Sequence, residues 1–150
     1  MPIRNASAIA LAGLLTMGAL TVFAQEAFTP PATPEEAVEQ RQALMREDGG
    51  ILRSAGNLTG AEAVAAMQTL QENYSHIPDL FPEGSIVGDS KALPAIWENW
   101  DAFVAIVDSG RIAAEEARAA AEVGDTATYA ASLRTIGGTC GECHQQFRAE

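Results

Sequence analysis

The sequence predicts an all-α fold, an antiparallel four-helix bundle. Four stretches carry apolar residues at helical spacing, and none alternates polar and apolar residues with a period of two over a useful length. Two short links and one long link join these stretches, and helices joined by short links pack as antiparallel neighbours. Of the 150 residues, 47% are hydrophobic and 19% are charged. This length and composition suit one domain with one packed core.

The first 24 residues have the features of a secretory signal peptide. Arg4 precedes an uncharged apolar run over residues 6–23, and the run ends in Val22-Phe23-Ala24, which matches an A-x-A-like cleavage site. The alternative is a membrane anchor, but the run is at the lower limit for spanning and no basic cluster follows it. We therefore predict export to a bacterial periplasm, cleavage after Ala24, and a soluble domain at 25–150.

The first predicted helix begins at Pro34, a residue that suits the first helical position. Thr33 is its expected N-cap, and Glu36 completes a capping box. An apolar stripe continues to about Ala55, with Gly49-Gly50 as a weak point or a bend.

The second predicted helix begins after Thr59, which forms a second expected capping box with Glu62, and it continues to about Tyr74. The long link follows over residues 77–93. It is rich in Pro and Gly, so it is expected to be a crossover loop with short turns.

The third predicted helix runs from Pro94 to Val123, where Gly124 stops it. Asp125 is the expected N-cap of the fourth, which runs towards Arg148. The apolar stripe of the third helix consists of Ile96, Trp97, Trp100, Phe103, Val104, Val107 and Ile112. We assign the aromatic members of this stripe to the core rather than to a cofactor site.

The charge balance excludes two classes of partner. The chain has 20 Asp and Glu against 9 Lys and Arg, a formal net charge of −11. Nucleic-acid binding requires a basic footprint, which this chain lacks. Lysine occurs only at Lys91, so an anionic membrane surface is also a poor partner.

One motif carries chemistry. Cys140-Gly141-Glu142-Cys143-His144 is C-x-x-C-H, the attachment signature of c-type haem. Two thiols three residues apart on a helix reach the two vinyl groups of one haem, and His144 can then supply an axial nitrogen to the iron. We predict one covalently attached haem c per chain, with Cys140 and Cys143 as thioether attachments.

Three other interpretations of the cysteines are weaker. A C-x-x-C redox pair normally lies at a helix start after a strand, whereas this pair lies inside the last helix. A zinc site would need a fourth ligand, and His76 is the only other histidine. A disulfide across so short a loop would constrain few residues. We expect His76 to be a surface residue.

These features together resemble the class II c-type cytochromes, the cytochrome c′ family. The motif lies six residues from the end of the sequence, and the resemblance covers essentially the whole mature chain. The matching pieces are Arg41-Gln42-Ala43-Leu44-Met45, Leu80-Phe81-Pro82, Ile96-Trp97, and Gly137-Gly138-Thr139-Cys140 through Phe147-Arg148.

The resemblance implies further site residues. Arg41 and Gln42 match residues that lie near a haem propionate, although a solvated helix face is the alternative for Arg41. Arg148 matches a basic residue near the proximal pocket, and His144 matches the proximal ligand. Met45 matches the position over the sixth coordination site of the iron, and core packing is its alternative role.

Met45 separates two functions that the resemblance allows. If Met45 ligates the iron, as in the low-spin members, the protein is an electron carrier. If it only packs, together with Leu44, the iron is five-coordinate and binds NO or CO. The segment from Met45 to Gly49 favours the low-spin members.

We therefore expect a periplasmic electron carrier rather than an enzyme, because the iron itself carries the electron. Its acidic surface predicts redox partners with basic docking patches. The resemblance also implies that homodimers through the first two helices are common.

Overall fold

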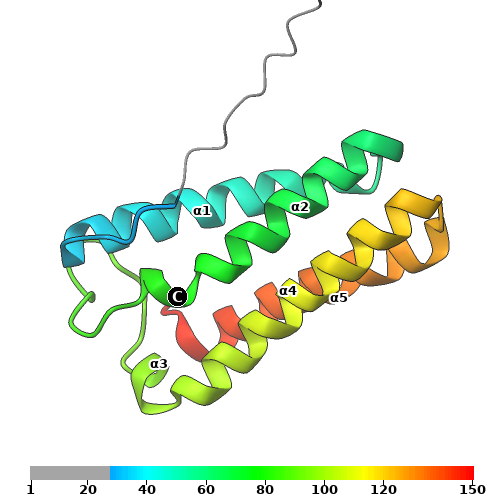
Figure 1. Cartoon of the computed structure of the whole chain (residues 1–150). Coiled ribbons are helices and arrows are strands. Elements are labelled where there is room, and N and C mark those ends of the chain that lie inside the picture. Colours follow the sequence, from blue (N-terminus) through cyan, green and yellow to red (C-terminus); the bar gives the residue numbers. More distant parts are fainter. Residues whose placement is uncertain (1–27) are drawn as a thin grey trace, which may run out of the picture.

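A computed structural model describes residues 28–150 of the chain, so the predicted signal peptide and its cleavage site lie outside the described residues. The described part contains four long helices and two short helical turns (Figure 1). They are α1 (Pro34–Ala55), α2 (Gly60–His76), η1 (Pro78–Leu80), α3 (Ala95–Glu98), α4 (Trp100–Val123) and α5 (Thr126–Phe147). The predicted all-α bundle is thus confirmed.

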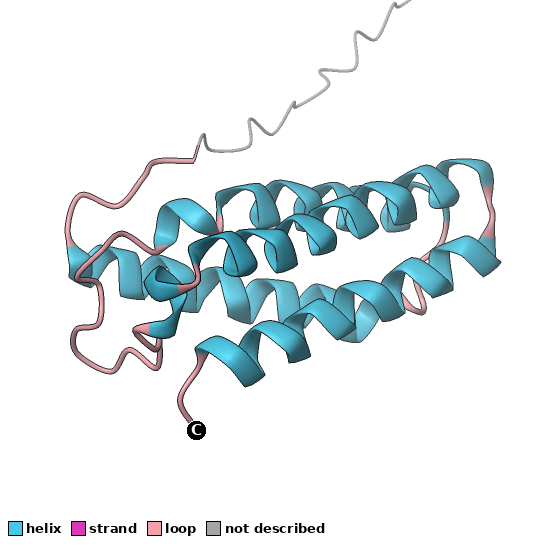
Figure 2. Cartoon of the chain, turned by 90° about the horizontal axis from the view of Figure 1, so that it is seen from below, coloured by secondary structure: helices cyan, strands magenta, loops and turns pink. Residues whose placement is uncertain are grey.

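The long helices form two antiparallel hairpins, α1 with α2 and α4 with α5 (Figure 1). The connection between the hairpins carries η1 and α3 at one end of the bundle, and the chain ends near it (Figure 2). No strand is present among residues 28–150, where the only β-type pairing is an isolated bridge between Ala92 and Arg148. None of the helices in this range is long and apolar enough to cross a bilayer.

The core lies where α4 packs against both α2 and α5. Small buried residues on α4, including Gly110 and Ala114, allow these helices to approach closely. By contrast, α1 makes few contacts with α5. The largest fully buried side chains are Phe103, Met67, Leu70, Leu80, Ile96 and Ile136.

Two of the three predicted N-caps are confirmed. Thr33 Oγ1 accepts from the backbone N–H of Glu36 at 3.1 Å. Asp125 Oδ1 accepts from the N–H groups of Ala127 (3.1 Å) and Thr128 (3.0 Å). These bonds satisfy N–H groups that the helix itself cannot pair, so they fix where α1 and α5 begin.

The side-chain hydrogen bond predicted for the N-cap Thr59 is absent. Thr59 is the N-cap residue of α2 but makes no side-chain cap bond. Gly60 follows it with a φ of +54°, a left-handed conformation open to glycine. This backbone turn replaces the expected capping box, and Thr59 contributes only its carbonyl oxygen, which accepts from the N–H of Ala63.

The predicted third helix is not continuous. It is interrupted at Asn99, whose φ of −132° and ψ of 46° leave the helical region, so that α3 has four residues and α4 starts afresh at Trp100. The Asn99 side chain donates to the carbonyl of Ala95 at 3.2 Å. Asparagine competes in this way with the helical backbone, which is why the apolar spacing alone missed the break.

Other expectations differ in detail. The helix α1 runs through Gly49-Gly50 without interruption, and α2 ends at His76 rather than Tyr74. Ile112 is 54% exposed and does not belong to the core. Phe103 is fully buried, whereas Trp97 and Trp100 are half-buried and pack against the core.

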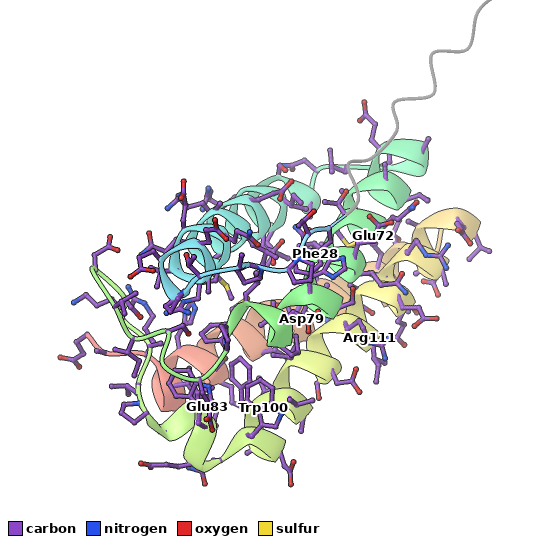
Figure 3. The ribbon with its side chains drawn as sticks, turned by 60° about the vertical axis from the view of Figure 1, so that its left-hand side comes forward. Phe28, Glu72, Asp79, Glu83, Trp100 and Arg111 are labelled. Atoms are coloured by element: carbon purple, nitrogen blue, oxygen red, sulfur yellow. The ribbon has the colours of Figure 1, made fainter. Side chains whose placement is uncertain are left out.

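His76 is half-buried rather than a free surface residue. Phe28 lies over the end of α2 (Figure 3), and its ring stacks on the imidazole of His76 with 3.9 Å between the centroids. This contact holds the start of the described chain against the bundle.

Candidate haem site

Two adjoining cavities lie between α1 and α5, where the two helices stand apart. The larger has a volume of about 500 Å³ and the smaller of about 230 Å³. Met45 on α1 and both Cys143 and His144 on α5 line the two cavities together. Cofactor pockets have volumes of about 300–1,000 Å³, so this space suits a cofactor.

The lining is largely apolar. Around the larger cavity, aromatic and aliphatic side chains come from the crossover connection, α3, α4 and α5. Around the smaller cavity, they come from α1, α4 and the end of α2. They are Phe81, Ile96, Phe103 and Phe147 in the first, and Leu52, Ile77, Ile106 and Val107 in the second. Such walls favour a flat, mainly apolar ligand over a hydrated ion.

The motif residues lie on one side of α5. Cys140 lines the smaller cavity, and Cys143 and His144 line both. Both thiols are free. A helix places residues three and four positions apart on the same face, which is why a helical C-x-x-C-H brings two thiols and one imidazole to the same space.

The protonation states suit these roles. Burial, with smaller contributions from Cys140 and Glu142, raises the pKa of Cys143 to about 11, so its thiol stays protonated near neutral pH. Partial burial lowers the pKa of His144, and the nearby charge of Arg148 lowers it further. A neutral imidazole has a free lone pair, which a metal ligand requires.

Arg41 is buried, so the alternative of a solvated helix face is wrong; it is 5% exposed. Its Nη1 donates to Leu80 O (3.1 Å) and Ser85 Oγ (2.9 Å). Its Nη2 donates to Ser85 O (2.6 Å) and Ser90 Oγ (2.7 Å). The guanidinium also lies 4.7 Å from the ring centroid of Phe81.

These bonds define what Arg41 does in this fold. All four terminal N–H groups of Arg41 are used by the crossover connection, which leaves only Nε–H for another acceptor. Arg41 therefore fastens the loop beside the larger cavity and adds a positive charge to its wall. Gln42 lines the same cavity and donates from Nε2 to Asp89 Oδ1 at 3.2 Å.

The larger cavity is electropositive in an acidic protein. Four of the eight Lys and Arg residues among residues 28–150 line it, and no Asp or Glu does. These four are Arg41, Arg46, Lys91 and Arg148. Charge of this sign suits the carboxylates that haem carries on one edge.

The C-terminal segment closes this side of the site. Arg148 follows α5 in an extended conformation and lines the larger cavity. Leu93 N–H donates to Phe147 O (2.9 Å), and Ala149 N–H donates to Lys91 O (2.8 Å). These bonds tie the end of α5, and so the His144 region, to the crossover connection.

Two residues of the smaller cavity were not predicted from the sequence. Tyr74 is 5% exposed, and its hydroxyl lies 3.3 Å from Cys140 Sγ. Asp48 is 4% exposed and accepts from Asn73 Nδ2 at 2.7 Å. Asp48 follows Met45 by three positions on one helix, a spacing that could have indicated it, but no local signal indicated Tyr74. Leu44, expected to shield the distal side, lines neither cavity.

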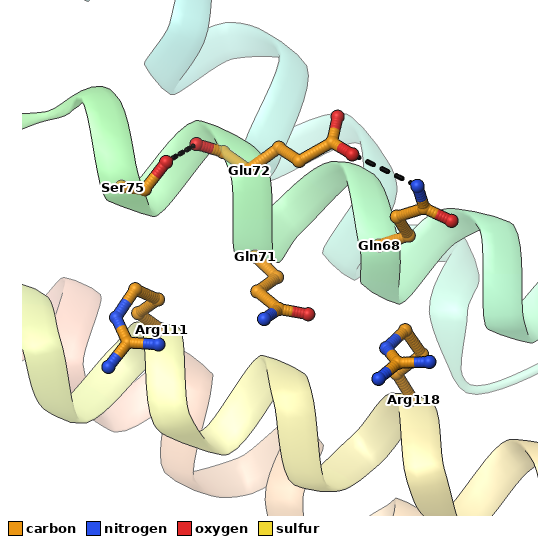
Figure 4. Close-up of a pocket in the computed structure, with 6 residues that line it drawn as sticks. All are labelled: Gln68, Gln71, Glu72, Ser75, Arg111 and Arg118. Atoms are coloured by element: carbon orange, nitrogen blue, oxygen red, sulfur yellow. Dashed lines mark hydrogen bonds between the residues drawn. The ribbon is translucent and has the colours of Figure 1, made fainter.

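A third cavity of about 420 Å³ lies between α2 and α4 and contains none of the predicted site residues. The side chain of Gln71 points into it between Arg111 and Arg118 (Figure 4). Its lining is polar and charged, which does not suit a haem.

The residues present fit a covalently bound haem. Two free thiols and an imidazole face an apolar space whose larger part has a cationic wall, while residues 28–150 contain no cluster of three or more His, Cys, Asp or Glu placed to hold a bare metal ion. A four-helix bundle with this site defines a c-type haem protein of the bundle class.

Comparison with known proteins identifies the family. The family model described as Cytochrome C' matches residues 36–148, so the chain belongs to the cytochrome c′ family. Its members are periplasmic proteins, and the chain binds haem c covalently.

Three known proteins illustrate the similarity. Cytochrome c-554 of Cereibacter sphaeroides is 45% identical over 125 residues, which cover 76% of this chain and 93% of that one. Cytochrome c-556 of Agrobacterium tumefaciens (strain II Chrys) is 37% identical over 119 residues, which cover 74% of this chain and 95% of that one. A solved cytochrome c′, described as having an unusual ligand-controlled dimer dissociation, is 25% identical to this chain. The match covers 80% of this chain and 99% of that one, with a TM-score of 0.72.

Proposed function

We propose that this chain is a periplasmic monohaem electron carrier with His144 and Met45 as the two axial ligands of the iron. The observation that carries the proposal is that Met45 on α1 and His144 on α5 line the same two cavities. A ligand on each side of the space between two helices suits a six-coordinate iron. When bound, the haem supplies an iron that takes up or gives up one electron.

The chain's own residues hold and shape the site. Cys140 and Cys143 provide the thioether attachments, and apolar side chains exclude water. Arg148 and Gln42 line the larger cavity, where the haem carboxylates are expected, and Arg41 supports the nearby loop. No residue has to act as acid, base or nucleophile, so the proposed role is that of a carrier rather than an enzyme.

Replacing Met45 by Leu tests the sulfur ligand, because leucine keeps the volume of the side chain and removes the sulfur. The expected result is a change of the oxidised spectrum from low-spin to high-spin, with loss of the sulfur-to-iron charge-transfer band and a lower reduction potential. Met67→Leu is the matched control, since Met67 is fully buried in the core and lines neither cavity. A Met45→Leu spectrum identical to that of the parent protein would refute Met45 ligation.

The alternative function is a five-coordinate cytochrome c′ that binds NO or CO. It is favoured by the solved relative whose dimer dissociation is ligand-controlled. In that case the unmodified protein has a broad high-spin Soret band and takes up CO readily. A low-spin spectrum with slow CO uptake decides for electron transfer.

The same relative supports the proposal of a homodimer, which sedimentation velocity with and without CO tests directly. The net charge of −11 supports redox partners with basic docking patches. Because the wall of the larger cavity is cationic, such partners should dock on surfaces away from that cavity. Partner reduction should slow as salt increases, and rates independent of salt would contradict this.

Export by the N-terminal segment remains part of the proposal. Mass spectrometry of the periplasmic protein should give a chain that starts at Gln25 and carries one haem. A protein retained in the membrane fraction would favour the anchor instead.

A further inference from the structure

Tyr74 connects three helices at the smaller cavity. It lies on the last turns of α2, its ring packs against Gly110 on α4, and its hydroxyl reaches α5. On α5 the hydroxyl lies 3.3 Å from Cys140 Sγ and 3.3 Å from Thr139 Oγ1. The first distance is normal for the large sulfur atom, whereas the second is long for two oxygens.

The direction of these hydrogen bonds follows from Thr139. Thr139 Oγ1 donates its single proton to the carbonyl of Ile136 at 2.8 Å, so it can only accept from Tyr74. Tyr74 then donates to Thr139, and its oxygen accepts from the Cys140 thiol. Burial raises the pKa of Tyr74, which keeps this hydroxyl protonated. A thioether sulfur at position 140 would have no proton to donate, so in the haem-bound chain the Tyr74 hydroxyl could only donate towards α5, with Thr139 Oγ1 and this sulfur as its two possible acceptors.

The ring of Tyr74 cannot move away from α5 towards α4, because it already packs against Gly110 on α4. A Cβ atom on residue 110 would lie 2.0 Å from Cε1 of Tyr74, so the ring fills the space that the glycine leaves. The hydroxyl is thus held at a fixed point by α4 while it contacts α5.

Cys140 and His144 lie one helical turn apart on the same face of α5. A small rotation of α5 about its axis would move both side chains relative to Met45 on α1. We propose that Tyr74 is a positioning residue that fixes this rotation, and with it the placement of Cys140 and His144 toward the haem. The inference rests on the proposed function only in taking His144 as an iron ligand.

The test is Tyr74→Phe in the holoprotein, because phenylalanine keeps the ring against Gly110 and removes only the hydroxyl. The matched control is Tyr129→Phe. Tyr129, on α5, is buried like Tyr74, but its hydroxyl donates to Ala55 O at 3.0 Å and it lines neither cavity. Each variant loses the single proton that its hydroxyl donates to a buried partner, so the two should lose similar stability. Only Tyr74→Phe should change the haem spectrum.

The readouts are the Soret circular dichroism, the high-spin fraction of the oxidised protein and the reduction potential. Tyr74→Phe should alter the Soret dichroism, increase the high-spin fraction and lower the potential. Thr139→Val, which removes the second contact, should cause a smaller shift in the same direction. Equal spectra for Tyr74→Phe and the parent, or equal changes in Tyr74→Phe and Tyr129→Phe, would overturn the proposal.

These outcomes separate this inference from the proposed function. If Met45 is not a ligand, the parent protein is already high-spin and Met45→Leu changes nothing. The Soret dichroism of Tyr74→Phe still differs from that of Tyr129→Phe if Tyr74 positions α5.

Discussion

Gly110 lies so close to Tyr74 that no side chain fits between α4 and α2 at this point. A Cβ atom on residue 110 would come within 2.0 Å of Cε1 and 2.6 Å of Cδ1 of the Tyr74 ring. Both atoms belong to a buried aromatic ring, which cannot yield as the end of a flexible chain can. The absence of a side chain at 110 therefore sets how closely α2 and α4 pack beside the haem cavities.

Gly110→Ala is expected to destabilise the protein by about 1–3 kcal/mol, the usual cost of overpacking a core. The added methyl group must displace the Tyr74 ring or separate the helices. Urea unfolding of the holoprotein measures the change. Gly138→Ala is the control, because Gly138 is inside α5 and nothing lies within 4 Å of its added Cβ. This control should be neutral or stabilising by up to about 1 kcal/mol, and equal losses in both variants would contradict the packing argument.

Arg41→Lys should destabilise the protein by about 2–4 kcal/mol. A lysine cannot reproduce the four hydrogen bonds of the buried guanidinium or its planar contact with Phe81, and each bond to a charged donor contributes roughly 1.5–3 kcal/mol before lysine's own bonds offset part of the loss. The unfolding midpoint in urea reports this. Arg134→Lys, at an exposed position on α5, should leave the midpoint unchanged. A stable Arg41→Lys variant would show that the loop is held by other contacts.

Asp48 makes stability depend on pH. Burial raises its pKa from 3.8 to about 6, with a smaller contribution from Glu47. Because the folded pKa is the higher one, the stability that Asp48 contributes is complete below pH 3.8 and is lost as the pH rises through about 6.

Asp48→Asn should therefore be more stable than the parent protein at pH 8, by at most roughly 3 kcal/mol. The advantage should disappear below about pH 4. The asparagine oxygen can still accept from Asn73, so the side-chain contact is kept. Unfolding free energies measured from pH 4 to 8 check the difference. Glu39→Gln, an exposed change on the same helix, is the control for the loss of one negative charge. Parallel profiles for Asp48→Asn and the parent would refute the argument.

The two predicted threonine caps provide a matched pair. Thr33→Ala removes a bond to the N–H of Glu36 and should cost about 1 kcal/mol. Thr59→Ala removes no cap bond and should cost clearly less. Thermal unfolding of both variants measures the stability that each one loses. Equal losses of stability would mean that the threonines act through something other than capping.

The sequence alone predicted the helices because their signals are local. The N-caps Thr33 and Asp125 act on N–H groups within three residues, and the C-x-x-C-H spacing brings its thiols together on any helix. The same reasoning failed at Asn99 and Thr59, where a side chain or a glycine turn competes with the helical pattern. These are choices between local conformations of similar energy, which apolar spacing does not resolve.

The tertiary structure decided which faces meet. The partners of Arg41 lie up to 49 residues away, and Tyr74 reaches Cys140 across 66 residues, so no local spacing contains either contact. Met45 was predicted from the family resemblance, but only the separation of α1 from α5 places it in the same cavities as His144. Local backbone preferences form the helices, whereas burial and hydrogen bonding between distant segments determine how those helices enclose the haem.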